Sequence, residues 1–338
     1  MQKVSLIAEL AYSHEGDINY LKELLEKIKD TKIDFIKFQI LLDKDDFYVK
    51  THPGYNSIDK WCFSEEEWEE ILFKNKKKSL VTVLDRKVLI FLEKNKDMFS
   101  GIEIHPSCLV DENLLYATCE LCEKLDKKLF LGISGYDLEK IDIILKKVKK
   151  YKIKEKFLIY GFQNFPTDIQ NLNLNKIKYL KEHYDEYQIV YADHTEYNDN
   201  NKRQIILLTF LLGAYYQEIH CVLNRGEVRT DYITGIEVNE FDEIYNTLSL
   251  ISNLLSRDSE EISIKEKEYF KNLGKIPVYG LDKKKGEILK KEDILYKRTE
   301  NKNFSIYIEN NLEKILNKKL KKNVLKDETI YIEDFEEV

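Results

Sequence analysis

Strand-like and helix-like segments alternate eight times over residues 1–255 of this 338-residue chain. The strand-like runs are short and apolar, and they cover residues 4–8, 35–39, 80–84, 101–105, 128–133, 157–160, 188–192 and 214–216. A (β/α)₈ barrel of the TIM type needs about 250 residues and this alternation. A doubly wound open sheet is the alternative, but it usually carries a glycine-rich turn after its first strand, and residues 11–16 do not form one. The sequence therefore predicts an α/β fold with a TIM barrel over residues 1–255.

The character of the sequence changes after residue 255. Residues 256–275 are highly charged, and we predict an irregular linker there. Residues 276–338 hold short β-like pieces separated by turns, at 276–279, 285–287, 294–296 and 329–332. A β-rich domain of this size buries little apolar surface, so we expect it to need a partner surface for stability.

Two histidines stand at the ends of neighbouring predicted strands. His194 follows the run at 188–192, His220 follows the run that begins at 214, and a helix-like segment over 201–212 lies between them. Strand, helix, strand is a βαβ unit, so both strands run parallel and open on the same side of the sheet. Two neutral imidazoles near carboxylates are a typical site for a divalent transition metal. The alternative is that each histidine only packs or hydrogen-bonds locally.

Other polar residues also gather where the predicted strands end. In a TIM barrel the C-terminal strand ends carry the active site. The polar residues at these positions, the two histidines included, are Glu9, Lys37, Gln39, Asp85, His105, Asp193, His194, Glu218 and His220. They form a cluster at one end of the predicted barrel, which favours an enzyme site there.

Composition excludes several classes of function. The net charge is −7, whereas a nucleic-acid-binding protein needs a basic face to neutralise phosphates. No stretch approaches the roughly 18 apolar residues that span a bilayer. The first predicted strand begins within a few residues of the N-terminus, so we expect no signal peptide and a cytoplasmic location. The sequence thus predicts neither nucleic acid nor membrane as a partner.

The cysteines fit a reducing compartment. There are five, an odd number, and their spacing matches no disulfide framework, which indicates reduced thiols. Cys119 and Cys122 form a C-x-x-C, but they fall on a predicted amphipathic helix where positions i and i+3 share one face. We interpret this pair as core packing rather than as a redox or zinc motif.

Several short motifs, in order along the chain, resemble the sialic acid synthase family. These are the bacterial enzymes that make N-acetylneuraminate, legionaminate and pseudaminate, together with related spore-coat polysaccharide proteins. The matching pieces cover residues 7–10, 13–16, 36–39, 165–167, 193–195 and 218–220. In the tail, residues 283–287, 293–294 and 297–298 are similar to the antifreeze-like (SAF) domain of that family.

The resemblance implies a TIM barrel joined to an antifreeze-like domain in a domain-swapped homodimer. It implies condensation of phosphoenolpyruvate with an N-acylated amino-sugar aldehyde to give a nonulosonic acid. A divalent metal, Mn²⁺ or similar, is expected on the residues that match the family's histidines, His194 and His220. The matching catalytic residues are Glu9 and Asp193. The expected substrate-binding residues are Lys37, Gln39, Thr82, Gln163, Thr195 and Arg298, and the last would reach the N-acyl group across the dimer.

The chain departs from the family where phosphoenolpyruvate is bound. A lysine of the fourth strand is replaced by Glu103, and the serine-and-glycine stretch after it reads His-Pro-Ser-Cys at 105–108. Further replacements stand at Gly132, Gln163 and Ala192. Charge-assisted hydrogen bonds are the strong contacts to a phosphate, and Glu103 replaces attraction by repulsion. Basic residues that could compensate are Arg86, Lys87, Arg203 and Arg225.

Three functions are therefore compatible with the sequence. The first is a working metal-dependent synthase that uses phosphoenolpyruvate. The second keeps the metal and the sugar but uses a different donor, because the phosphate contacts are lost. The third is a non-catalytic sugar-binding protein descended from a synthase, since fold and ancestry do not fix function.

Overall fold

The computed structural model describes the chain except residues 1–2, 77, 162–163, 257–259, 300–311 and 337–338. The chain divides into two compact units, Met1–Ser256 and Arg257–Val338. No helix among the described residues is both long enough and apolar enough to cross a membrane.

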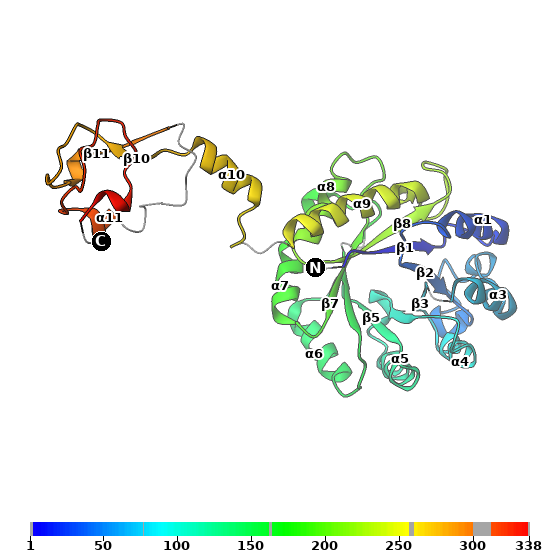
Figure 1. The fold of residues 1–338 in the computed structure, drawn as a ribbon. Coiled ribbons are helices and arrows are strands. Elements are labelled where there is room, and N and C mark those ends of the chain that lie inside the picture. Colours follow the sequence, from blue (N-terminus) through cyan, green and yellow to red (C-terminus); the bar gives the residue numbers. More distant parts are fainter. Residues whose placement is uncertain (1–2, 77, 162–163, 257–259, 300–311, 337–338) are drawn as a thin grey trace. The chain divides into compact units, whose positions relative to one another are not determined.

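The first unit is a closed parallel barrel, as predicted (Figure 1). Its strands pair in chain order from β1 to β8, and β1 also pairs with β8, which closes the barrel. They are β1 (Ser5–Ala11), β2 (Phe35–Ile40), β3 (Ser79–Val83), β4 (Gly101–Ile104), β5 (Lys128–Gly132), β6 (Lys156–Tyr160), β7 (Gln188–Asp193) and β8 (Tyr216–Val222). A short ninth strand, β9 (Ile236–Glu237), pairs with β8.

Helices surround the barrel and begin at clear capping residues (Figure 1). Asp17 caps the first of them, and Ser64 with Glu67 forms a capping box at the start of the third. The helices of this unit are α1 (Ile18–Ile28), α2 (Lys44–Phe47), α3 (Glu65–Asn75), α4 (Arg86–Lys94), α5 (Glu112–Leu125), α6 (Leu138–Val148), α7 (Asn175–His183), α8 (Lys202–Leu211) and α9 (Val238–Leu255). Cys119 and Cys122 are buried on α5, as the packing interpretation requires.

The interior of the barrel has an apolar lower layer and a polar upper layer. Side chains alternate between the two faces of each strand, so every second residue points inward. The lower layer consists of Ile7, Leu80, Phe130, Phe157, Ile159, Val190 and Ala192, with the rings of Phe130 and Phe157 stacked 4.1 Å apart. One step further toward the C-terminal strand ends, the same faces carry charged residues. Strand register aligns Glu9 with Lys37 on one side and with His220 on the other.

The second unit is small and has its own apolar core. Strands β10 (Ile276–Tyr279) and β11 (Ile294–Lys297) pair antiparallel, and the short helix α11 (Leu312–Ile315) follows. Its buried core residues are Tyr279, Leu289, Ile315, Leu320, Val324, Ile330 and Phe335. The pieces predicted at 285–287 and 329–332 are not strands, although Thr329 forms an isolated bridge with Val278.

The predicted irregular linker is partly helical. Helix α10 (Ile264–Leu273) occupies half of residues 256–275, so the expectation of irregular structure there is wrong. The cause is a capping box, in which Ser263 accepts from the backbone of Glu266 and the Glu266 side chain accepts from the backbone of Ser263.

Candidate active site

A cavity of about 240 Å³ opens among the C-terminal ends of the barrel strands. Most of the polar residues predicted to gather there line it. The lining residues are Glu9, Tyr12, Lys37, Gln39, Glu103, His105, Pro106, Ile159, Phe165, His194, Glu218, His220, Thr230 and Asp231. Asp85 is the exception near β3, because its buried carboxylate accepts from the backbone of Leu42 and Val88 instead.

His194 and His220 converge on one point together with Glu9. One ligand atom from each of the three residues lies within 4.8 Å of the other two. His220 Nε2 is 3.6 Å from Glu9 Oε2, and the two imidazole centroids are 5.2 Å apart. All three side chains are buried, yet His194 Nδ1 and His220 Nε2 have no hydrogen-bond partner among the described residues. Buried polar atoms are normally paired, so these two nitrogens are available to a bound ligand.

The protonation states of this group suit a metal ion. Burial, together with the neighbouring His220, lowers the pKa of His194 to about 3. Burial alone would raise the pKa of Glu9, but the charge of Lys37, whose Nζ is 3.0 Å from Glu9 Oε1, outweighs it and holds that pKa well below its usual value. A neutral imidazole beside an ionised carboxylate is the form in which both groups bind a divalent cation. Glu9, His194 and His220 therefore fit a divalent transition metal such as Mn²⁺.

The ring of Phe165 packs edge-on against both imidazoles. Its centroid lies 4.8 Å from that of His194 and 5.9 Å from that of His220. The loop that carries it is tied to β7 by a hydrogen bond from the Thr167 backbone N–H to the His194 carbonyl, 2.7 Å long. Phe165 thus gives the pair of histidines an apolar wall on one side.

Lys37 is held by three carboxylates of the protein itself. Glu9 Oε1 and Glu103 Oε2 each lie 3.0 Å from Lys37 Nζ. Glu218 Oε1 is closer, at 2.6 Å. None of the four side chains is more than 5% exposed. Burial would lower the pKa of Lys37, but Glu103 and Glu218 raise it well above its usual value, so the ammonium stays charged.

The neighbouring predicted substrate contacts are also turned toward protein carboxylates. Gln39 Nε2 donates to Glu9 Oε1 at 3.0 Å. Thr82 Oγ1 donates to Glu103 Oε2 at 2.7 Å, and Thr82 does not line the cavity. Lys37, Gln39 and Thr82, which were predicted to bind substrate, instead belong to a buried cluster with the protein's own carboxylates.

Asp193 and Thr195 do not line the cavity. Strand residues alternate in direction, so the inward orientation of His194 places Asp193 on the outer face of β7. There Asp193 forms a buried ion pair with Lys202 of α8 and accepts from Thr195 Oγ1 at 3.0 Å. Lys202 Nζ also donates to the carbonyl of Thr195 at 2.9 Å. Asp193, predicted to be catalytic, and Thr195, predicted to bind substrate, thus contact Lys202 and each other outside the cavity.

Gln163 and Arg298 complete the predicted substrate contacts. Gln163 falls outside the described residues. Arg298 is exposed and belongs to the second unit. His14 is buried beside Phe63, with ring centroids 4.7 Å apart, and its Nδ1 accepts from the Gly16 backbone N–H.

Gly132 stands where the resemblance to the family predicts a serine, and the ring of Pro106 fills the space that a side chain there would need. A Cβ at Gly132 would lie 2.3 Å from the ring Cδ of Pro106, too close for any side chain. Pro106 comes from the altered stretch after β4 and lines the cavity. The replacement at Gly132 and the altered stretch at 105–108, which are far apart in the sequence, therefore meet in one packing contact.

None of the four basic residues considered as replacements lines the cavity. Arg86 pairs with Asp46 on the surface. Arg203 and Arg225 both pair with Glu240 at the N-terminal end of α9. Their charges are compensated outside the barrel mouth.

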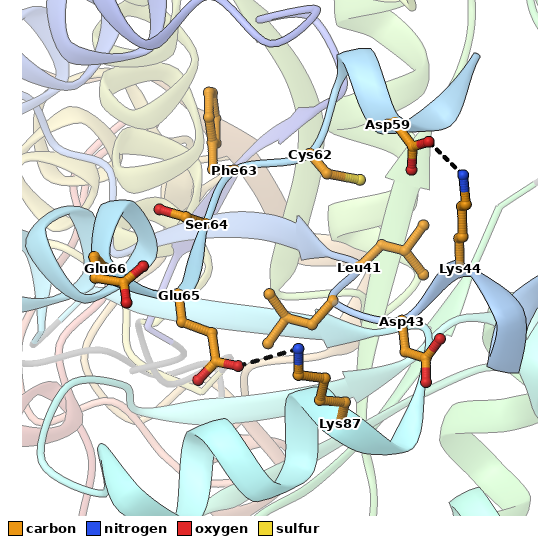
Figure 2. A pocket seen from close by; sticks show the side chains of 11 residues that line it. Leu41, Asp43, Lys44, Asp59, Cys62, Phe63, Ser64, Glu65, Glu66 and Lys87 are labelled. Carbon is orange, nitrogen blue, oxygen red and sulfur yellow. Dashed lines mark hydrogen bonds and ion pairs between the residues drawn. The ribbon is translucent and has the colours of Figure 1, made fainter. Parts of the chain in front are cut away.

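Lys87 lies in a second, larger cavity of about 460 Å³, shown in Figure 2. This cavity lies between the loop after β2 and the first turns of α3 and α4. Its charged residues pair with each other, Lys87 with Glu65 at 3.3 Å and Lys44 with Asp59. It contains none of the predicted site residues, so it is distinct from the candidate active site.

The sequence analysis did not assign three of the lining residues, Tyr12, Thr230 and Asp231, to the site. Tyr12 follows Ala11, which adopts a positive φ of 41° at the end of β1. Asp231 also has a positive φ, 62°, and burial raises the pKa of its carboxyl. Both residues stand in loops after strands, where alternation no longer predicts side-chain direction, although the position of Asp231 after the last strand was a usable signal.

Comparison with known proteins relates the whole chain to one group of enzymes. The model of the NeuB family matches residues 24–260. The N,N′-diacetyllegionaminic acid synthase of Campylobacter jejuni is 26% identical over 96% of this chain and 99% of its own length. An uncharacterized protein of Methanocaldococcus jannaschii is 28% identical over 97% of this chain and 94% of its own length. The crystal structure of a spore coat polysaccharide biosynthesis protein E from Chromobacterium violaceum has a similar fold, with a TM-score of 0.79, 18% identity and coverage of 99% of this chain and all of the other.

Proposed function

The chain belongs to the NeuB family, and on that premise we propose that it joins a three-carbon acid donor to the aldehyde carbon of an N-acylated amino sugar. The product would be a nonulosonic, sialic-acid-like acid. The observation that carries the proposal is the convergence of Glu9, His194 and His220 on one point at the barrel mouth. A divalent metal on these residues would act as a Lewis acid toward the aldehyde oxygen.

The chain's own residues would position the reactants around this point. Phe165 provides an apolar wall beside the two histidines, and Tyr12 and Asp231 present polar atoms across the cavity. Asp193 and Lys202 hold His194 in place from the outer face of the barrel. Positioning of this kind can supply a large part of a rate enhancement, because it replaces a bimolecular encounter by a fixed geometry.

Kinship with sialic acid synthases implies phosphoenolpyruvate as the donor and manganese or a similar ion as the metal. It also implies that residues 276–338 form an antifreeze-like domain in a domain-swapped homodimer, with Arg298 reaching the sugar bound to the partner. The small separate core around Tyr279 and the exposure of Arg298 support this part of the proposal.

The ion pairs of Lys37 favour a second candidate, a family member with a different donor or a non-catalytic sugar-binding role. Lys37 and Thr82 are the residues that match donor contacts in the family, and both are bound to carboxylates of this chain. In either alternative, Glu9, His194 and His220 would still hold a metal ion and the sugar would still bind beside it.

The test is product formation by the full chain. Purified protein with Mn²⁺ would be incubated with N-acylated hexosamines and with phosphoenolpyruvate or pyruvate, and nine-carbon acids would be detected by mass spectrometry. We expect a product that disappears in His194→Ala and His220→Ala but persists in His183→Ala, because His183 is exposed on α7. Absence of product with every sugar and both donors, from a protein that binds Mn²⁺, would contradict the proposed reaction and leave the sugar-binding alternative.

A further inference from the structure

We propose that the part of this cavity around Lys37 and Glu103 binds the donor, excludes phosphorylated acids and accepts a 2-oxo acid without a phosphate group. Pyruvate is the simplest acid of this kind. Glu103 is the residue that sets this specificity. The inference rests on the proposed function and specifies its donor. It follows from the charges around Lys37, from the loss of neutral hydrogen-bond donors and from the packing of Pro106.

Lys37 has no capacity left for a phosphate. Its ammonium has three N–H groups, and three carboxylate oxygens lie within 3.0 Å of Nζ. Drawing Lys37 toward a bound phosphate would leave Glu103 and Glu218 without their cation in a dry site. Removing one partner of a buried ion pair is strongly unfavourable, because the remaining charge is uncompensated.

The rest of the cavity offers no replacement for Lys37. Among the described residues that line it, four carry carboxylates and Lys37 alone carries an ammonium or guanidinium group. The carboxylates belong to Glu9, Glu103, Glu218 and Asp231. A phosphate monoester brings about two negative charges at neutral pH, so it would add to an excess of negative charge.

Neutral donors have also been removed from this side of the cavity. Thr82 already donates its hydroxyl hydrogen to Glu103. Pro106 has no backbone N–H, and its ring fills the space next to Gly132 where a hydroxyl-bearing side chain would stand. The loss of cation, hydroxyl and N–H groups at adjacent positions indicates a site adapted to a smaller and less charged donor.

A 2-oxo acid meets these limits. It carries one negative charge, and its carboxylate and keto oxygens can both approach a divalent ion on Glu9, His194 and His220, so it needs no protein cation of its own. In phosphoenolpyruvate the corresponding oxygen is esterified with phosphate. The chemical step balances without a further reactant: the methyl carbon of pyruvate loses a proton and bonds to the aldehyde carbon, and the aldehyde oxygen gains a proton.

Pyruvate and phosphoenolpyruvate would give the same nine-carbon acid, so each donor is supplied alone and the release of phosphate is measured together with the product. The phosphoenolpyruvate reaction consumes water and releases phosphate, whereas the pyruvate reaction does neither. We expect product from pyruvate and none from phosphoenolpyruvate. Product from phosphoenolpyruvate with release of phosphate would overturn this inference and uphold the proposed function. Absence of product from both donors would overturn both.

Binding gives a readout that does not depend on turnover. In calorimetry of the Mn²⁺-loaded full chain, we expect heat of binding with pyruvate and none with phosphoenolpyruvate. Glu103→Gln keeps an acceptor for Thr82 but removes the charge, and Glu103→Lys reverses it. We expect both variants to gain affinity for phosphoenolpyruvate by about tenfold or more, whereas Glu66→Gln, an exposed change in the second cavity, would not.

Two calorimetric results would contradict the inference. Binding of phosphoenolpyruvate to the unaltered chain would show that the cavity admits a phosphorylated donor. Absence of any gain in both Glu103 variants, with thermal unfolding unchanged, would show that Glu103 does not set the specificity.

Discussion

At the scale of single residues, the proposed chemistry depends on the two histidines of neighbouring strands, His194 and His220, which converge with Glu9. We expect His194→Ala and His220→Ala each to weaken Mn²⁺ binding by about a hundredfold or more, because each removes one of three converging ligands. Titration calorimetry measures this directly. His183→Ala, on the outer surface of α7, is the matched control and should bind Mn²⁺ like the unaltered chain. Equal affinity in all four proteins would contradict the proposed ligand set.

Lys37 is predicted to be essential for stability. Lys37→Met leaves three buried carboxylates without a cation, and breaking a buried ion pair in this way costs about 3–5 kcal/mol. Urea unfolding should show this loss in the free energy of unfolding. Lys74→Met, which removes an exposed lysine paired with Glu70, should change it by less than about 1 kcal/mol. A small effect at Lys37 would mean that the carboxylates are not ionised together.

His14 should make stability depend on pH. Burial lowers its pKa to about 4, so the unfolded chain takes up a proton at this residue before the folded chain does as the pH falls. The stabilisation is complete above a pH of about 6.5 and is lost progressively as the pH falls toward about 4. Between about pH 7 and about pH 5, the unaltered chain should therefore lose about 2 kcal/mol more than His14→Phe. Parallel pH profiles of the two proteins in urea unfolding would show that His14 is not buried as a neutral ring.

The direction of each strand-end residue could be predicted from alternation, but its partner could not. Because His194 points inward, Asp193 had to point outward, and applying that rule would have removed Asp193 from the catalytic residues. Its partner Lys202 lies in the next helix and shows no signal in the sequence. The replacement at Glu103 was visible in the sequence, but the ion pair that it forms with Lys37 needed the barrel register.

At the scale of elements, the end of β5 and the turn after β4 form one packing unit. Gly132→Ala should lower the free energy of unfolding by about 1–3 kcal/mol, because its Cβ would lie 2.3 Å from Pro106 Cδ. Pro106→Ala in the same chain should restore part of that loss. A double-mutant cycle measured by urea unfolding tests this coupling, and additive effects would contradict it.

Secondary structure could be predicted where short apolar runs recur at regular spacing along the chain. The eight barrel strands are the example, and all were found. Helix α10 was missed although Ser263 and Glu266 have capping-box spacing, because the density of charges around it resembles a linker. Two expected β pieces of the second unit are turns or isolated bridges, since runs of three or four residues carry too little periodicity to separate these states.

At the scale of the whole molecule, closure of the barrel creates the site. Pairing of β1 with β8 aligns Glu9 with His220, and these two residues are far apart in the sequence. The barrel, and the placement of His194 and His220 on neighbouring strands, could be predicted because both depend on strand order alone. The acidic cluster around Lys37 depends on which side chains meet across the interior, so it became visible only in three dimensions.

The most direct test of the account is an anomalous difference map from a crystal of the full chain soaked with Mn²⁺. The account predicts one strong peak about 2.0–2.3 Å from a nitrogen of His194, a nitrogen of His220 and an oxygen of Glu9. A map without a peak at this position, or imidazole rings that point away from each other, would contradict it.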